Sequence, residues 1–256
     1  MAPKLIAHRL NRLTALRRAL NWRRSIPGLW LECDLRATSD RLIIAQHDPE
    51  CQGRQVHEWP ADALPGSVLT LDDVMRQVRP TGATMHLDVK ALRADGGWQA
   101  AITASRLLAV LKDHGMARRA VVSALAGGFL RRLRRLDPHL RLGVLCDAAY
   151  GEPRPRTRPA VRRLLTKLLA FHWAVKLEAV FLNQAWLRAF DRQWRLAGDF
   201  LRILRGAGMR PMVWTVNDPV WARRLMALGA DRITTDEPGR LWRTLTRPLA
   251  TESSQT

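Results

Sequence analysis

Two carboxylates that lie two residues apart are the first feature of this 256-residue sequence that could do chemistry. Glu32 and Asp34 interrupt an apolar segment, residues 29–35, that predicts a strand. Residues i and i+2 of a strand share a face, so both carboxylates point one way while Leu31 and Cys33 point the other. Two like charges so close are costly unless a proton or a cation offsets them, and oxygen ligands suit a hard cation such as Mg²⁺ or Ca²⁺. The pair therefore predicts a divalent metal site, with two solvated surface acids as the alternative.

A second strand-like segment, residues 84–89, repeats this arrangement. Asp88 and Lys90 are again two residues apart, so they share a face at the end of the segment. They add a third carboxylate and a cationic donor to the expected site.

Two histidines also follow short apolar runs. His8 and Arg9 close the run at residues 5–8, and His47 follows the run at residues 42–45. A single histidine is usually structural, but imidazole is well suited to move protons near neutral pH. Two histidines, three acids, one arginine and one lysine in one place predict metal-assisted phosphoester chemistry.

The elements that must position these residues alternate along the chain as short apolar runs and longer helical patterns. About eight such units favour an α/β fold of the closed (β/α)8 TIM barrel type, which typically has about 250 residues. Because function in these barrels lies at the C-terminal ends of the strands, the candidate residues are expected to meet in one mouth. The expected strands cover residues 5–8, 29–35, 84–89, 120–123, 140–145, 179–182, 211–216 and 231–234. The expected helices cover residues 13–22, 98–114, 129–136, 161–174, 186–207, 219–228 and 240–245, and another begins at Leu71 with Thr70 as its N-cap.

The barrel is expected to occupy residues 1–250 as a single domain without a linker. A small insertion rich in proline, glycine and polar residues covers residues 48–68, after the second strand region. Residues 251–256 form a polar tail.

The formal net charge is +19, and arginine supplies nearly all of the positive charge. A solvated basic surface is one interpretation, and an anionic partner such as lipid headgroups, nucleic acid or a phosphorylated substrate is the other. No stretch reaches the roughly 18 uninterrupted apolar residues that a membrane span needs. Three widely spaced cysteines suit reduced thiols, so a soluble, cytoplasmic protein is expected.

One basic segment gives a more specific partner hypothesis. Five arginines cluster around two prolines and lead into an apolar helix, namely Arg154, Arg156, Arg158, Arg162 and Arg163. Such a segment could dock on an anionic membrane surface, where each cation contributes about 1 kcal/mol, and a solvated loop is the alternative. Nucleic acid is not expected as a partner, because the chain lacks a recognisable binding motif and interleaved exposed aromatic residues.

Several motifs follow one another in a fixed order along nearly the whole chain. They include Ile6-Ala7-His8-Arg9, residues 31–40, His47-Asp48-Pro49, residues 69–74, Leu87-Asp88-Val89-Lys90, residues 122–123, Trp214-Thr215-Val216-Asn217 and residues 229–238. In this order they resemble the glycerophosphodiester phosphodiesterase family, a family of barrels that cleave glycerophosphodiesters to glycerol 3-phosphate and an alcohol.

The resemblance implies a role for each candidate residue and a small phosphodiester as substrate. His8 and His47 would be the acid–base pair, and Arg9 and Lys90 would hold the phosphate. The ligands of the divalent cation, Mg²⁺ or Ca²⁺, would be Glu32, Asp34 and Asp88. Trp214, which closes its strand, would form a wall of the substrate pocket, with a barrel-core aromatic as the alternative.

Three departures from the family pattern bear on the site. Leu10 stands where the family usually has glycine, and the usual Glu-Asn-Thr segment is absent, which shortens the loop to residues 10–12. Both departures concern substrate fit, because this loop borders the pocket. Asp88 stands where glutamate is common, and its side chain is one methylene shorter, which concerns metal geometry.

Two other functions fit parts of this pattern. A phospholipase of the C or D type, acting on lipids or lysolipids, would share the barrel and the pair of histidines. The three acids and the segments around Trp214 and Asp236 favour the phosphodiesterase over it. A non-catalytic protein that binds an anionic membrane or nucleic acid would use the arginines, but the presence of both histidines and both phosphate-binding cations favours an enzyme.

Overall fold

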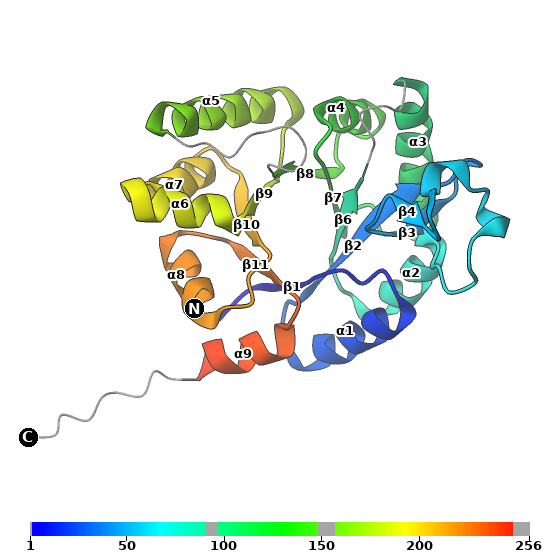
Figure 1. The fold of residues 1–256 in the computed structure, drawn as a ribbon, viewed down its shortest axis with the longest axis horizontal. Helices are drawn as coiled ribbons and strands as arrows, with labels where there is room; N and C mark the ends of the chain where they lie inside the picture. The colour runs from blue at the N-terminus through cyan, green and yellow to red at the C-terminus, as the bar shows by residue number, and fades with distance from the viewer. Residues whose placement is uncertain (1, 91–96, 148–156, 248–256) are drawn as a thin grey trace, which may run out of the picture.

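In a computed structural model, which describes residues 2–90, 97–147 and 157–247, eight parallel strands close into a barrel (Figure 1). The barrel closes because β1 pairs in parallel with both β2 and β11. This confirms the expected (β/α)8 TIM barrel. Its strands are β1 (Leu5–Ala7), β2 (Trp30–Ala37), β6 (Met85–Val89), β7 (Ala120–Ala124), β8 (Arg141–Cys146), β9 (Ala179–Asn183), β10 (Arg210–Trp214) and β11 (Arg232–Thr235).

A ring of helices covers the outside of the barrel (Figure 1). The helix α2 begins at the expected position, because the Thr70 side chain accepts a hydrogen bond from the Asp73 amide and forms a capping box. The helices are α1 (Leu13–Ser25), α2 (Leu71–Val78), α3 (Gly97–Asp113), α4 (Gly127–Leu136), α5 (Arg158–Val175), α6 (Gln184–Trp194), α7 (Ala197–Gly206), α8 (Pro219–Leu228) and α9 (Pro238–Thr246).

The expected helix over residues 186–207 is wrong, because the chain forms two helices there. Arg195 takes a left-handed conformation, with a φ of 54°, and ends α6. The helix α7 then starts afresh at Ala197, and its buried side chains include Phe200 and Leu204. A break gives each helix its own direction, so that the apolar residues of both contact the barrel.

The insertion after the second strand region is small and has some regular structure. The strand β3 (Ile43–Ala45) pairs antiparallel with the end of β2. A two-stranded hairpin of β4 (Glu50–Cys51) and β5 (Arg54–Gln55) follows. Short 3-10 turns cover Val56–Glu58 and Ala61–Ala63 of the insertion, and a further one, Arg79–Thr81, follows α2.

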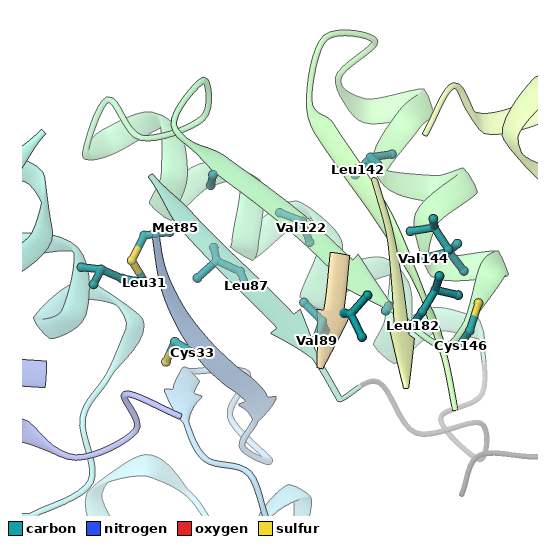
Figure 2. Packing of buried hydrophobic residues seen from close by; sticks show 14 of the residues in the cluster. Leu31, Cys33, Met85, Leu87, Val89, Val122, Leu142, Val144, Cys146 and Leu182 are labelled. Atoms are coloured by element: carbon teal, nitrogen blue, oxygen red, sulfur yellow. The ribbon is translucent and has the colours of Figure 1, made fainter. Parts of the chain in front are cut away.

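The alternation along each strand separates the apolar core from the polar mouth. Leu31, Cys33, Leu87 and Val122 point outward into the core between the strands and the helices (Figure 2). Inside the barrel, a separate apolar cluster includes Trp30 at the start of β2 and Phe181 on β9. The carboxylates of β2 and β6 share this inner face and lie towards the mouth of the barrel.

Trp30 closes the bottom of the barrel under three arginines. The Cζ atoms of Arg141, Arg210 and Arg232 lie 5.3, 5.2 and 4.1 Å from the centroid of its ring. Two acids partly balance these cations, since Glu178 pairs with Arg141 and Arg210, and Asp231 pairs with Arg210.

We expect Trp30→Ala to lower the free energy of unfolding by about 3–5 kcal/mol, because it removes a large buried side chain and leaves a cavity. Trp30 is 5% exposed, whereas Trp173 is 65% exposed, so Trp173→Ala is the matched control. Chemical denaturation of both variants measures the difference. An equal loss of stability in the two variants would contradict this account of the barrel bottom.

Candidate active site

Three buried carboxylates meet at the mouth of the barrel. One oxygen each of Glu32, Asp34 and Asp88 lies within 4.8 Å of the other two. Parallel pairing brings them together, because Asp34 on β2 is the register partner of Asp88 on β6. Asp88 Oδ1 is buried without a hydrogen-bond partner among the described residues. The sequence prediction that these three side chains can share one cation agrees with this geometry.

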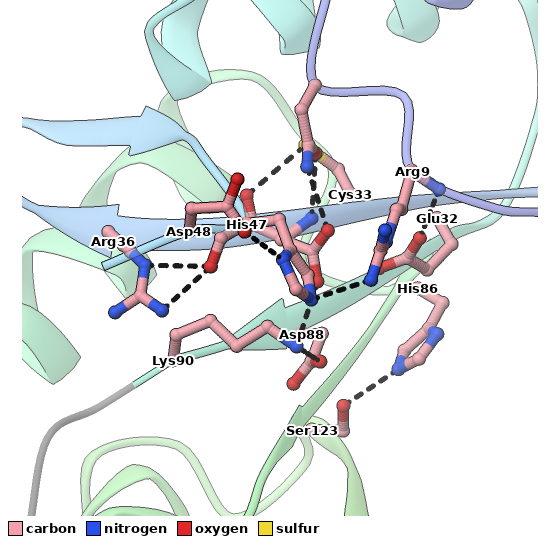
Figure 3. Close-up of polar contacts among 12 residues, drawn as sticks. Arg9, Glu32, Cys33, Arg36, His47, Asp48, His86, Asp88, Lys90 and Ser123 are labelled. Carbon is pink, nitrogen blue, oxygen red and sulfur yellow. Dashed lines mark hydrogen bonds and ion pairs between the residues drawn. The ribbon is translucent and has the colours of Figure 1, made fainter. Parts of the chain in front are cut away.

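Lys90 lies between two of the carboxylates (Figure 3). Its Nζ atom is 2.9 Å from Asp34 Oδ1 and also pairs with Asp88 Oδ2. Burial opposes its charge, but Asp88 and Asp34 outweigh burial and raise the pKa of Lys90. Lys90 therefore stays charged and offsets part of the negative charge of the cluster.

The carboxylates still carry more charge than Lys90 can balance. Burial, together with the charges of Asp34 and Asp88, raises the pKa of Glu32 well above its usual value. Burial likewise raises the pKa of Asp88. For Asp34, burial is outweighed by Lys90 and by a hydrogen bond from Asn11, so its pKa is lowered. Three acids against one cation, with an unsatisfied oxygen on Asp88, fit a bound divalent cation.

Each of the two candidate histidines is held by an aspartate through Nδ1. His8 Nδ1 is 2.7 Å from Asp236 Oδ1, and His47 Nδ1 is 2.8 Å from Asp48 Oδ1. A carboxylate at Nδ1 favours the tautomer that carries its proton there, which leaves Nε2 for proton transfer. Asn217 in turn donates to Asp236 Oδ2 at 2.8 Å, so this aspartate is itself fixed.

Arg9, just after β1, contacts both the carboxylate cluster and His47. Its backbone is left-handed, with a φ of 57°, and its amide donates to Glu32 Oε2 at 2.6 Å. Its guanidinium is 2.9 Å from His47 Nε2 (Figure 3). Because arginine only donates, His47 Nε2 is the acceptor in this contact. Arg36 holds the backbone of the same histidine, donating twice to its carbonyl at 2.7 and 3.0 Å.

Asn11 is a site residue that the sequence analysis missed. Its Nδ2 donates to Asp34 Oδ2 at 2.8 Å, and its Oδ1 accepts from the Asp34 amide at 3.0 Å and from Cys33 Sγ at 3.3 Å. Asn11 thus orients one of the three carboxylates. The sequence signal for this role was the position of Asn11, which follows Arg9 by two residues in the loop after the first strand.

His86 and Asp236 also had no predicted role. His86 lies inside the barrel, hydrogen-bonded to Ser123 Oγ at 2.7 Å and stacked on Phe181 with 3.7 Å between the ring centroids. Burial lowers the pKa of His86 to about 3, so this ring is neutral. Asp236 belonged to a quoted motif, and its contact with His8 spans 228 residues of sequence.

Trp214 ends β10 and packs against the apolar cluster inside the barrel. Its Nε1 is buried without a hydrogen-bond partner among the described residues. This position agrees with the barrel-core alternative and leaves the predicted pocket wall as a proposal.

A parallel barrel with acids, histidines and cations at the C-terminal ends of its strands is the arrangement of a barrel enzyme. The sequence model of the Glycerophosphoryl diester phosphodiesterase family matches residues 49–240, which is more than half of the chain. The chain belongs to this family. The matched segment includes Asp88 and Lys90, whereas His8, Glu32 and His47 precede it.

A curated relative and several solved structures are similar to this chain. A glycerophosphodiester phosphodiesterase from Caldanaerobacter subterraneus subsp. tengcongensis is 22% identical over 136 residues, which are 53% of this chain and 46% of the relative. A phosphodiesterase from Oleispira antarctica, solved in complex with the product sn-glycerol-3-phosphate, has a TM-score of 0.75 at 17% identity and covers 96% of this chain and 98% of its own. A glycerophosphodiester phosphodiesterase from Parabacteroides distasonis has a TM-score of 0.74 at 18% identity, with 95% and 96% covered. These structures share the fold of the chain.

Among the described residues, the helices include none that is both long enough and apolar enough to cross a membrane.

Proposed function

We propose that this protein hydrolyses glycerophosphodiesters to glycerol 3-phosphate and an alcohol. One observation carries the proposal: two histidine–aspartate pairs, Arg9 and Lys90 surround a cluster of three buried carboxylates at one end of the barrel. Family membership and the structural relative bound to sn-glycerol-3-phosphate support it.

In this proposal Glu32, Asp34 and Asp88 hold Mg²⁺ or Ca²⁺, since all three offer oxygen ligands. When bound, the cation would neutralise charge on the non-bridging phosphate oxygens. Arg9 and Lys90 bind the same oxygens from the protein side, and the charge that grows there strengthens both contacts. Lys90 is already fixed by two aspartates, so it is in place before the substrate binds.

The two histidines divide the proton transfers. His47 accepts a hydrogen bond at Nε2, so it has the free electron pair that a general base needs once Arg9 turns to the phosphate. It takes the proton of the nucleophile, which is water or the neighbouring glycerol hydroxyl. Attack by the hydroxyl would expel the alcohol and form a cyclic glycerophosphate, which water would then open to glycerol 3-phosphate. His8 gives a proton from Nε2 to the leaving alkoxide, while Asp236 stabilises its imidazolium form through Nδ1.

The test is an assay of the purified protein against a panel of glycerophosphodiesters and lysophospholipids, with Mg²⁺, Ca²⁺ or Mn²⁺ and with chelator. We expect release of glycerol 3-phosphate from at least one glycerophosphodiester. Turnover of lysophospholipids alone would favour the phospholipase, and absence of any turnover would overturn the enzymatic proposal.

Asp236→Asn is expected to lower kcat by about 10²-fold, because an amide at Nδ1 no longer favours the productive tautomer or the charged form of His8. The pH profile of kcat should change as well, since the histidine loses its anionic partner. Asp218→Asn, at the exposed N-cap of α8, is the control. An unchanged rate and pH profile in Asp236→Asn would remove this aspartate from the mechanism.

The proposed cellular setting is the cytoplasm, in agreement with three cysteines that form no disulfide with one another, two of which are buried. Arg154 and Arg156 of the predicted membrane-docking segment lie outside the described residues. Arg158, Arg162 and Arg163 are exposed on α5, so they are available to an anionic lipid surface.

We expect the protein to sediment with anionic vesicles more than with neutral vesicles at low salt, because each cation near the surface contributes about 1 kcal/mol. Salt should weaken this binding, and the double change Arg162→Glu and Arg163→Glu should reduce it. Equal sedimentation with both kinds of vesicle would exclude docking.

A further inference from the structure

A cavity of about 690 Å³ lies beside the mouth of the barrel. Its walls are the loop before α1 and the first turn of α1 (residues 11–14), residues 45–46 at the end of β3, residues 50–52 of the hairpin and residues 65–69. Figure 1 shows the dark blue segment between β1 and α1 running towards this cyan part of the chain. The volume is within the range of small-molecule sites, about 300–1,000 Å³.

Two residues of the cavity wall also belong to the surroundings of the carboxylate cluster. Asn11 lines the cavity and donates to Asp34 Oδ2 at 2.8 Å. Gln46 also lines the cavity and directly precedes His47. Its backbone amide donates to the backbone carbonyl of Asp34 at 3.0 Å. Through Asn11 the cavity wall contacts one carboxylate of the cluster, and its lining residue Gln46 is the chain neighbour of His47, the proposed general base.

About half of the residues that line the cavity are polar, and together the lining residues carry no net charge. One cation, Arg12, and one anion, Glu50, balance each other, so neither a cationic nor an anionic group is favoured. Trimethylammonium groups are recognised by aromatic faces, and none of the lining residues is aromatic. Amide and hydroxyl side chains both donate and accept, as alcohol hydroxyls do. These side chains are Asn11, Thr14, Gln46, Gln52 and Ser67.

We propose that this cavity binds the alcohol part of the substrate and selects polyhydroxy alcohols such as glycerol or inositol over choline. The inference rests on the proposed function, because it gives a binding place to the alcohol that leaves the glycerophosphodiester. Arg9, Lys90 and the cation that the carboxylates would hold bind the phosphate, and the cavity holds the hydroxyl-rich alcohol that leaves it.

The test compares kcat/KM for three substrates that share glycerol 3-phosphate and differ in the alcohol, namely the glycerol, choline and methyl esters. The glycerol ester is expected to be the best of the three, by at least about tenfold. The methyl group is too small to use the cavity, so the methyl ester reports the chemistry of the site alone.

Two variants address the cavity itself. Ser67→Phe, at an exposed position, places a ring in the cavity and should lower kcat/KM for the glycerol ester by at least about tenfold, mainly through KM. Thr14→Val removes one hydroxyl without changing size and should cost about three- to tenfold, the range of one hydrogen bond. Neither should change the rate with the methyl ester, and Thr166→Val, on the exposed face of α5, should change neither rate.

The outcomes separate this inference from the proposed function. Turnover of all three esters at similar rates, or equal effects of Ser67→Phe on the glycerol and methyl esters, would overturn the cavity assignment and leave the phosphodiesterase intact. Absence of turnover with all three esters would overturn both.

Discussion

His8→Ala and His47→Ala are each expected to lower kcat by about 10²- to 10⁴-fold, which is what one positioned acid or base contributes. Each change removes an imidazole that an aspartate orients through Nδ1, so the proposed proton transfer at Nε2 is lost. The side chains are 13% and 32% exposed, and both changes should leave the fold intact.

Steady-state kinetics on the best glycerophosphodiester measures this loss, and circular dichroism checks the fold. His139→Ala, at an exposed position before β8, is the matched control and should keep its rate. Near-unchanged turnover in His8→Ala or His47→Ala would remove that histidine from the mechanism. If His47 is the base and His8 the acid, the two variants should also lose opposite limbs of the pH profile.

Asp88→Asn is expected to remove most of the activity, at least about 10²-fold, because it deletes a ligand charge without changing size. A bound cation stabilises the transition state by several kcal/mol, and about 1.4 kcal/mol corresponds to a tenfold change in rate. Asp88→Glu should preserve activity or bind the metal more tightly, since its carboxylate reaches further from β6. With aspartate, the wild-type site should depend on metal but bind it more weakly than the glutamate variant.

Isothermal titration of Mg²⁺ and Ca²⁺ measures the affinity of each variant independently of activity. Asp62→Asn, an exposed carboxylate in the insertion, is the control and should leave affinity and rate unchanged. Full activity in Asp88→Asn, together with no effect of chelator on the wild-type protein, would show that Asp88 is not a ligand. The three acids would then be held only by protein groups, with Lys90 at Asp34 and Asp88 and the Arg9 amide at Glu32.

Local features of the chain were readable from the sequence. The alternation in β2 already put Glu32 and Asp34 on one face, because the side-chain period of a strand depends only on neighbouring residues. The helix α8 has the predicted bounds, Pro219–Leu228, since proline at its start and glycine after its end act within one turn. The break between α6 and α7 was not readable, because it depends on how each helix packs on the barrel.

The order of residues along the chain was enough to predict the strand–helix alternation, the polar residues at the strand ends and the motifs of the family. Which of these residues touch depends on how the barrel folds. The parallel register puts Asp34 beside Asp88, and barrel closure between β1 and β11 brings Asp236 to His8. Asn11 reaches Asp34 because the loop after β1 folds back along β2. Such contacts join residues far apart in the chain, and they exist only once the strands have paired around the closed barrel.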